Sequence, residues 1–261
     1  MATPLVLSAR YSRRGARAPL GALYALLDEI QTILIATPTP EVRQAKIAFW
    51  ETELAAATTG AARHPLARAL PSGSVLAIAT DALEAARTEA ALTDTVPGDL
   101  LRMLLVKQCG QPLRRAASLE GASASPALDY AETVGTAYAL TVRLQTLGLA
   151  ARHRPWEIAS LAAAASDQSP EQGGAYAAMA VLRDWAASAY EAARRLASTP
   201  SLLPRSTRVL AALGEQLLKE LSEDIRVDPR RLLAGRILLP DPRMHWIALR
   251  ALWGRRLRLR P

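Results

Sequence analysis

The chain has 261 residues, half of them hydrophobic, and a formal net charge of +8. This composition excludes an intrinsically disordered protein, because it supplies enough apolar side chains for a packed core. Ala, Leu and Arg dominate, all of them good helix formers, and runs of β-branched and aromatic residues typical of strands are nearly absent. The composition therefore predicts an all-α fold.

Breakers divide the first half of the chain into predicted helices. The limits of these helices are set by the two prolines at 38 and 40, Gly60, the Pro-Ser-Gly run at 71–73 and the Pro-Gly pair at 97–98. Pro112 is expected to kink the last of these helices, because proline lacks the N–H that an inner turn needs. The predicted helices cover about 19–36, 41–58, 65–70, 74–92 and 99–119.

The most apolar predicted helix, about 126–149, is expected to pass through the middle of a bundle. We expect an irregular stretch at 150–170, with one short apolar run at 158–165. Two long helices, a connector and a final helix follow at about 171–197, 204–225, 227–240 and 244–253. Connections are short and no repeat is visible, which predicts one domain over 1–261, with a basic N-terminal arm (1–17) and a basic tail (254–261).

Several segments, in chain order, are similar to one known family. ALYALLDEI at 22–30, KIAFWETEL at 46–54, HPLARAL at 64–70 and GTAYALT at 135–141 resemble the motif helices of squalene/phytoene synthases. Residues 202–208 and 235–252 are similar to the closing helices of that family. The resemblance covers nearly the whole chain and implies a single helical bundle of the isoprenoid synthase type, with a central apolar cavity that holds prenyl chains.

The resemblance also implies where catalytic carboxylates should stand. In active members two facing helices each carry a paired Asp motif, and together these motifs hold the Mg²⁺ that stabilises the departing diphosphate. Here the first motif falls on Gln31, Thr32 and Ile35, and the second on Thr146 and Ala150. None of these side chains carries a carboxylate.

The loss of carboxylates does not depend on an exact alignment. No acid occurs between Glu29 and Glu41, and none between Glu132 and Glu157, so no small shift restores either motif. The sequence thus predicts no metal site and no cofactor. It resembles a divergent member of the family, similar to the branch that contains an assembly factor for respiratory complex I, whose Asp motifs are likewise degraded.

Ligand contacts are expected from both motif helices and from a basic segment after the second. Asp28, one turn before Gln31, either points into the cavity or lies on the helix surface. The segment Arg152-His153-Arg154 falls where active relatives carry a basic flap that could hold a diphosphate or a lipid phosphate without metal. The expected ligand-binding residues are Tyr24, Asp28, Thr32, Tyr138, Thr141, Arg152 and Arg154.

Arginine makes up 29 of the 32 basic residues, either because the chain binds anions or because a GC-rich genome favours Arg codons. The tail at 255–260 alternates Arg with apolar residues after Trp246 and Trp253. It is either an anchor for an acidic membrane surface or a solvated tail. Nucleic acid is not an expected partner, because aromatic residues make up only 5% of the chain and no reader motif is visible.

Three functions remain open at this point. The leading one is a non-catalytic family member, a pseudoenzyme that binds an isoprenoid lipid, a prenyl diphosphate or a protein partner. The second is an active head-to-head prenyltransferase of terpenoid biosynthesis, which would condense farnesyl or geranylgeranyl diphosphate with a rearranged Mg²⁺ site. The third is a helical interaction module with a filled cavity. A single cysteine, Cys109, and the lack of a long uncharged apolar run favour the cytoplasm, with peripheral contact at the inner membrane as a second expectation.

Overall fold

Helix formers and well-placed prolines give a chain that is helical along almost all of its described length. The computed structural model describes residues 3–71, 73–165, 174–197, 199, 202–235 and 238–253. The helices before the central element are α1 (Pro4–Ala9), η1 (Arg14–Ala16), α2 (Arg17–Ala36), α3 (Pro40–Thr58), α4 (Pro65–Ala69), α5 (Ser74–Ala90), α6 (Gly98–Leu105), η2 (Val106–Gly110) and α7 (Gln111–Leu119). The others are α8 (Ser125–Gln145), α9 (Leu147–His153), α10 (Pro155–Ala163), α11 (Gly174–Leu196), α12 (Arg205–Val227), α13 (Pro229–Ala234) and α14 (Asp241–Trp253).

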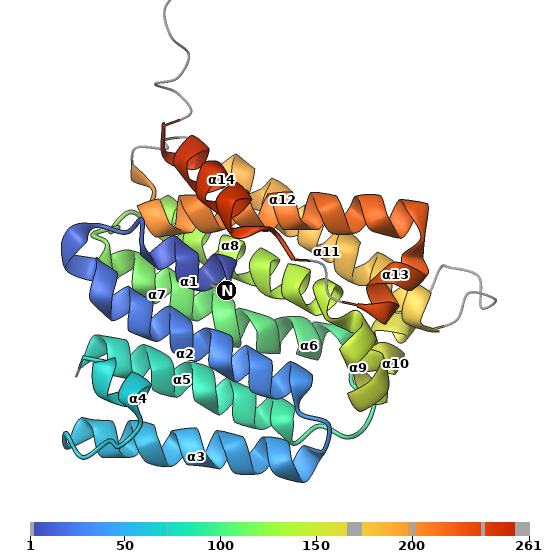
Figure 1. Ribbon diagram of the computed structural model, residues 1–261, viewed down its shortest axis with the longest axis horizontal. Helices are drawn as coiled ribbons and strands as arrows, with labels where there is room; N and C mark the ends of the chain where they lie inside the picture. Colours follow the sequence, from blue (N-terminus) through green and yellow to red (C-terminus); the bar gives the residue numbers. More distant parts are fainter. Residues whose placement is uncertain are drawn as a thin grey trace, which may run out of the picture.

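Helix α8 runs through the middle of the bundle, as its apolar sequence predicts (Figure 1). It packs against α7, α11 and α12, and its side chains from Ala137 to Gln145 are all buried. Residues 14–36 are long and apolar enough to span a membrane by length and composition. However, 61% of their apolar window is buried inside the bundle, so this segment is a core helix of the described fold. One core therefore joins the described helices, and the all-α bundle is confirmed.

The expectation of an irregular stretch at 150–170 was wrong over the residues that the structure describes. Helix α9 continues to His153, and α10 begins at Pro155. Only Arg154, with φ −142° and ψ 63°, leaves the helical region. Proline is well tolerated in the first turn of a helix, where its missing N–H has no partner to lose, so Pro155 starts a helix instead of preventing one.

The kink predicted from Pro112 takes the form of a π-helical turn at η2, between α6 and α7. Since Pro112 offers no N–H to the carbonyl of Gln108, the regular ladder opens just before it. The same place is a close helix crossing. A Cβ at Gly135 of α8 would lie 2.6 Å from the Cys109 carbonyl oxygen, so glycine lets the two backbones meet.

The segment expected as a basic N-terminal arm begins with a packed helix. In α1, Leu5 and Leu7 are each only 1% exposed, and the helix contacts α2 and α12. The Tyr138 side chain of α8 hydrogen-bonds with the backbone of Leu5. Thus α1 belongs to the core, and the exposed part of the segment is formed by arginines such as Arg10 and Arg14.

Two of the segments that carry the family resemblance contact each other. The Glu53 carboxylate of α3 accepts hydrogen bonds from the backbone N–H groups of Arg63 (2.9 Å) and His64 (2.7 Å). The Trp50 and His64 rings meet edge to face, with their centroids 4.6 Å apart. These contacts fix α3 against the start of α4, so the Phe-Trp and His-Pro signals mark a structural junction of the fold.

Candidate functional site

The two degenerate motifs lie on helices that contact each other, α2 and α9. On α2, Gln31 and Ile35 are 7% and 4% exposed and face the interior, whereas Thr32 is exposed to solvent. On the other side, Thr146 and Ala150 are both buried at the junction between α8 and α9. The Thr146 hydroxyl donates to the Val142 carbonyl (2.7 Å), so it is occupied by its own helix. Four of the five motif positions therefore face the interior without a carboxylate.

Four buried charged residues form an ion quartet. They are Glu89 of α5, Arg143 of α8, Arg154 directly before α10 and Glu157 in α10. Each of the four side chains is 1% exposed. Arg143 lies 2.7 Å from a Glu89 oxygen and 3.3 Å from Glu157. Arg154 lies 2.9 Å from Glu89 and 2.6 Å from Glu157. Since each arginine contacts both glutamates, the quartet is a closed ring of alternating charge.

Two glutamines connect the first motif helix to this quartet. The Gln31 side-chain amide donates to the Gln108 carbonyl oxygen (3.1 Å), and the Gln108 amide donates to Glu89 (2.8 Å). Gln108 is 1% exposed and belongs to the π-helical turn η2. A motif position where the family resemblance implies a metal-binding acid is thus tied here, through neutral amides, to an internal ion pair.

Mutual attraction keeps Glu89, Arg143 and Arg154 charged despite their burial. Burial alone would raise the pKa of Glu89, but Arg143 and Arg154 outweigh it and hold the pKa below its ordinary value. Burial also acts to lower the pKa of Arg143, and the two glutamates reverse this and raise it. Burial lowers the pKa of Arg154 to about 10, still well above neutral pH. Glu89 and both arginines are therefore ionised at pH 7.

A fifth buried charge stands beside the ring. Arg43 of α3 is 1% exposed and donates to the Thr37 carbonyl (3.3 Å). Its pKa is lowered mainly by burial, partly offset by Glu89. Because the quartet itself is neutral, Arg43 leaves the region with one net positive charge.

The side chains at the motif positions do not fit Mg²⁺. Within the described ranges, no three potential ligands among His, Cys, Asp and Glu come together. Glu89 and Glu157 are bound by two guanidinium groups, which a metal ion would have to displace. Hard divalent ions select several oxygen ligands, and Ile35 and Ala150 offer no side-chain oxygen.

The expected ligand-binding residues are divided among three environments. Tyr24, Tyr138 and Thr141 are at most 4% exposed and packed in the core. Burial raises the pKa of both tyrosines, whose hydroxyls stay protonated. Asp28 is half-buried, and Thr32 and Arg152 are exposed. Of the seven, Arg154 alone belongs to the ion quartet.

The sequence did hold a signal for the quartet residues that were not predicted. Arg143 is the single charged residue between Glu132 and Arg152, in the most apolar helix of the chain. Charged side chains are very seldom buried without a partner, so this arginine already required an acid from elsewhere. The sequence alone does not identify Glu89, 54 positions away, as that partner.

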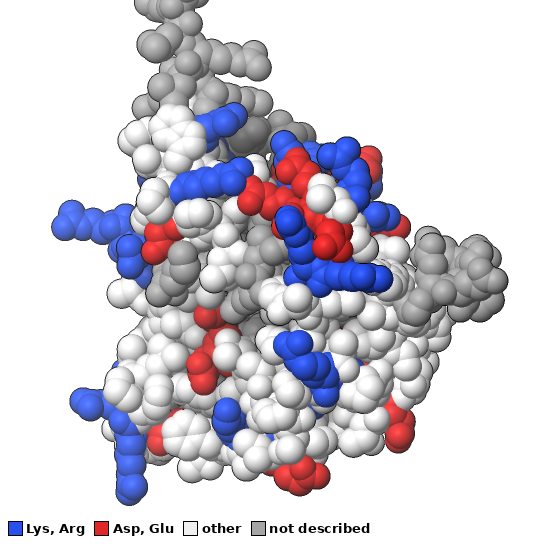
Figure 2. All heavy atoms as spheres, turned by 45° about the vertical axis from the view of Figure 1, so that its right-hand side comes forward, with Lys and Arg blue, Asp and Glu red and all other residues white. Residues whose placement is uncertain are grey.

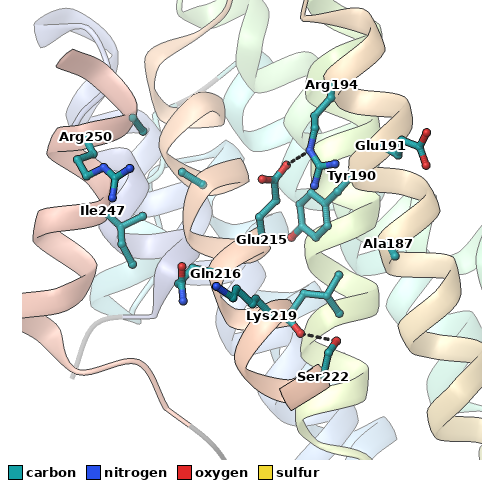
Figure 3. A pocket seen from close by; sticks show the side chains of 13 residues that line it. Ala187, Tyr190, Glu191, Arg194, Glu215, Gln216, Lys219, Ser222, Ile247 and Arg250 are labelled. Carbon is teal, nitrogen blue, oxygen red and sulfur yellow. Dashed lines mark hydrogen bonds and ion pairs between the residues drawn. The ribbon is translucent and has the colours of Figure 1, made fainter. Parts of the chain in front are cut away.

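A separate groove lies on the surface between α11, α12 and α14, with a volume of about 730 Å³. Apolar side chains such as Leu218 and Ile247 line it, and Lys219 and Arg250 add positive charge. Figure 3 shows the Tyr190 ring beside Glu215, with Ile247 and Arg250 on α14 across the groove. Glu215 accepts a hydrogen bond from Arg194 (3.1 Å). The groove combines apolar side chains with three bases (Arg194, Lys219 and Arg250) and two acids (Glu191 and Glu215), which suits an amphipathic ligand.

No known family model matches the chain, and no curated protein matches it in sequence. Solved structures do match. A dehydrosqualene synthase, crystallised with a ligand, is similar with a TM-score of 0.58 and 14% identity, over 96% of this chain and 91% of that one. The squalene synthase HpnC from Alicyclobacillus acidocaldarius is similar with a TM-score of 0.57 and 18% identity, over 88% and 89%. The chain therefore has the isoprenoid synthase fold seen in squalene and dehydrosqualene synthases.

Proposed function

We propose that this chain is a non-catalytic squalene/phytoene synthase-like protein that binds an isoprenoid lipid without ionising a prenyl diphosphate. The observation that carries the proposal is the buried ion quartet, tied to Gln31 through Gln108. Ionising an allylic diphosphate requires positive charge placed to stabilise the leaving group. Here two of the buried arginines are already paired with Glu89 and Glu157.

The groove between α11, α12 and α14 is the proposed lipid site. Its apolar side chains can cover part of a prenyl chain, and the exposed Arg250 can contact an anionic head group. Two other charged residues that line the groove already form ion pairs: Arg194 pairs with Glu215, and Glu191 pairs with Arg195. A ligand here would not have to break the quartet.

The catalytic part of the proposal is tested with radiolabelled farnesyl and geranylgeranyl diphosphate, with and without Mg²⁺. We expect no release of diphosphate under either condition, with an active squalene synthase as positive control. Metal-dependent release would overturn the proposal. It would support the alternative, a head-to-head prenyltransferase with a rearranged site.

The binding part is tested by thermal unfolding in the presence of farnesol or farnesyl diphosphate without metal. A ligand that binds the folded state raises the melting temperature in proportion to the logarithm of its concentration. Ala187, which is exposed and lines the groove, is replaced by Trp to fill it, and we expect the shift to disappear. Ser188→Trp, at the next position of the same helix, is the control, because Ser188 is also exposed but lies outside the groove lining.

The control variant should keep the shift of the wild-type protein. If no isoprenoid shifts the melting temperature of the wild-type protein, lipid binding is refuted. The fold would then serve as a helical module for a protein partner, as in an assembly factor. If both Trp variants lose the shift equally, the groove is not the site.

A further inference from the structure

The fold gathers basic segments from both ends of the sequence at one end of the bundle. The Tyr11 hydroxyl, just after α1, lies 3.0 Å from the His245 Nδ1 of α14. The Arg208 side chain near the start of α12 donates to the Ala251 carbonyl of α14 (2.6 Å). In Figure 1 the turn from α1 to α2, the start of α12 and the end of α14 all lie on the left. We call this region the basic end.

Helix α14 presents an aromatic face to solvent at the basic end. Trp246 and Trp253 are 58% and 53% exposed, and Met244 and Ala248 are buried on the opposite face. The two tryptophans are seven residues apart, which is about two helical turns or 10 Å, so they project from the same side. Arg250, also exposed, lies between them on this side.

Positive charge surrounds these tryptophans. The nearby acid Glu120 is 3% exposed and accepts hydrogen bonds from the first N–H groups of α12, so it does not reach the surface. The exposed arginines at the basic end include Arg10, Arg13, Arg14, Arg17, Arg205 and Arg250.

The other end of the bundle differs in charge. Figure 2 shows Lys and Arg side chains mixed with Asp and Glu where the C-terminal half of α12 meets α13. Ion pairs such as Lys219–Glu223 and Arg243–Glu220 form there. At the basic end exposed arginines predominate, although Glu191 of α11, which pairs with Arg195, lines the same groove as Arg250. At the opposite end the exposed bases are interspersed with acids.

We propose that the basic end docks on an anionic lipid bilayer, with Trp246 and Trp253 in the interface and the arginines at the phosphates. Tryptophan prefers this depth because its ring is apolar while its N–H can still donate. Arginine side chains contribute by electrostatic attraction to acidic lipids. Leu202, 62% exposed before α12, adds apolar area at the same end. Exposed tryptophan and leucine favour a bilayer over a nucleic acid as the partner, and the proposal does not depend on the lipid groove.

The test uses the full chain and vesicles of phosphatidylcholine alone or with 30% phosphatidylglycerol, separated by flotation. We expect binding to the acidic vesicles, reduced by added salt, and little binding to the neutral ones. Two double variants test the surface: one replaces both tryptophans (Trp246→Ala with Trp253→Ala), and the other reverses two charges (Arg10→Glu with Arg14→Glu). Each should lower the partition coefficient for acidic vesicles about tenfold or more. All four positions are exposed, so these variants should fold normally.

Matched controls lie elsewhere on the bundle. Phe49→Ala removes an aromatic side chain that is 48% exposed on α3, far from α14 in Figure 1. Arg230→Glu with Arg231→Glu makes the same charge change on α13, at the opposite end. Both controls should bind within about twofold of the wild-type protein. Three results would overturn the proposal: an equal loss of vesicle binding in test and control variants, equal binding of the wild-type protein to neutral and acidic vesicles, or no binding to either. Tighter binding to a DNA duplex than to acidic vesicles at the same salt would overturn it in favour of nucleic acid.

Discussion

Replacing Glu89 by Gln tests whether the buried ion quartet holds the fold together. The substitution keeps the size of the side chain and one acceptor oxygen, but removes the charge. Arg143 and Arg154, each 1% exposed, would then share the single acid Glu157. Together with Arg43, the region would carry two net positive charges, with little access to water.

The expected loss of stability is large because the remaining charges stay buried. Removing one partner of a buried ion pair costs about 3–5 kcal/mol. The free energy of unfolding of a natural domain is only about 5–15 kcal/mol, so the variant would lose a substantial fraction of it. For a chain of this length, about 2 °C of melting temperature corresponds to 1 kcal/mol, which gives a decrease of roughly 6–10 °C.

The measurement is urea and thermal unfolding of Glu89→Gln beside Asp81→Asn. Asp81 lies two turns earlier on α5 and pairs with Arg115, but its side chain is 63% exposed. An exposed pair contributes about 1 kcal/mol or less, so this control should unfold almost like the wild-type protein. If the two variants lose similar stability, the quartet does not have the role assigned to it. A second variant, Glu89→Gln with Arg154→Gln, should be less destabilised than the sum of its single changes, because it restores neutrality.

Three further outcomes are expected. The pKa of Glu89 is lowered in the folded state, so its contribution to stability is present above about pH 4.3 and is lost as the pH falls through the folded pKa. The urea midpoints at pH 7 and pH 3 should therefore differ less in Glu89→Gln than in the wild-type protein. Gly135→Ala should lower the free energy of unfolding by about 1–3 kcal/mol, because the added Cβ would lie 2.6 Å from the Cys109 carbonyl oxygen. Gly21→Ala, in α2, has free space for its Cβ and should raise the free energy of unfolding by up to about 1 kcal/mol; urea unfolding measures both. Burial raises the pKa of the Cys109 thiol to about 12, so iodoacetamide at pH 8 should label it only after unfolding, and rapid labelling of the native protein would contradict this burial.

Helix positions could be predicted well because prolines and glycines limit them in this sequence. The long helices α2, α3, α5, α8, α11 and α12 agree with predicted segments within a few residues. The prediction of an irregular stretch failed at 150–163, where Pro155 occupies the first turn of α10 and a first-turn proline costs a helix little. The packing of α1 was missed because six residues show too little periodicity to distinguish a core helix from an arm.

The candidate site was predicted only in part. The absence of paired acids is a property of the sequence, and the structure adds that four of the five motif positions are buried. What replaces them was not predictable, because Glu89 and Arg143 are joined by tertiary structure. The role of Arg154 was assigned from a resemblance to a flap that faces a ligand, whereas its guanidinium contacts Glu89 and Glu157 of the same chain.

The ion quartet has a simple physical explanation. A guanidinium buried as deeply as those of Arg143 and Arg154 requires an anion nearby, since an unpaired charge in the interior is strongly disfavoured. In this chain Glu89 and Glu157 supply the negative charge internally, so the folded state requires neither ligand nor metal to neutralise both arginines. A diphosphate would have to separate four close ion pairs before it could bind there, which is why we place lipid binding in the surface groove.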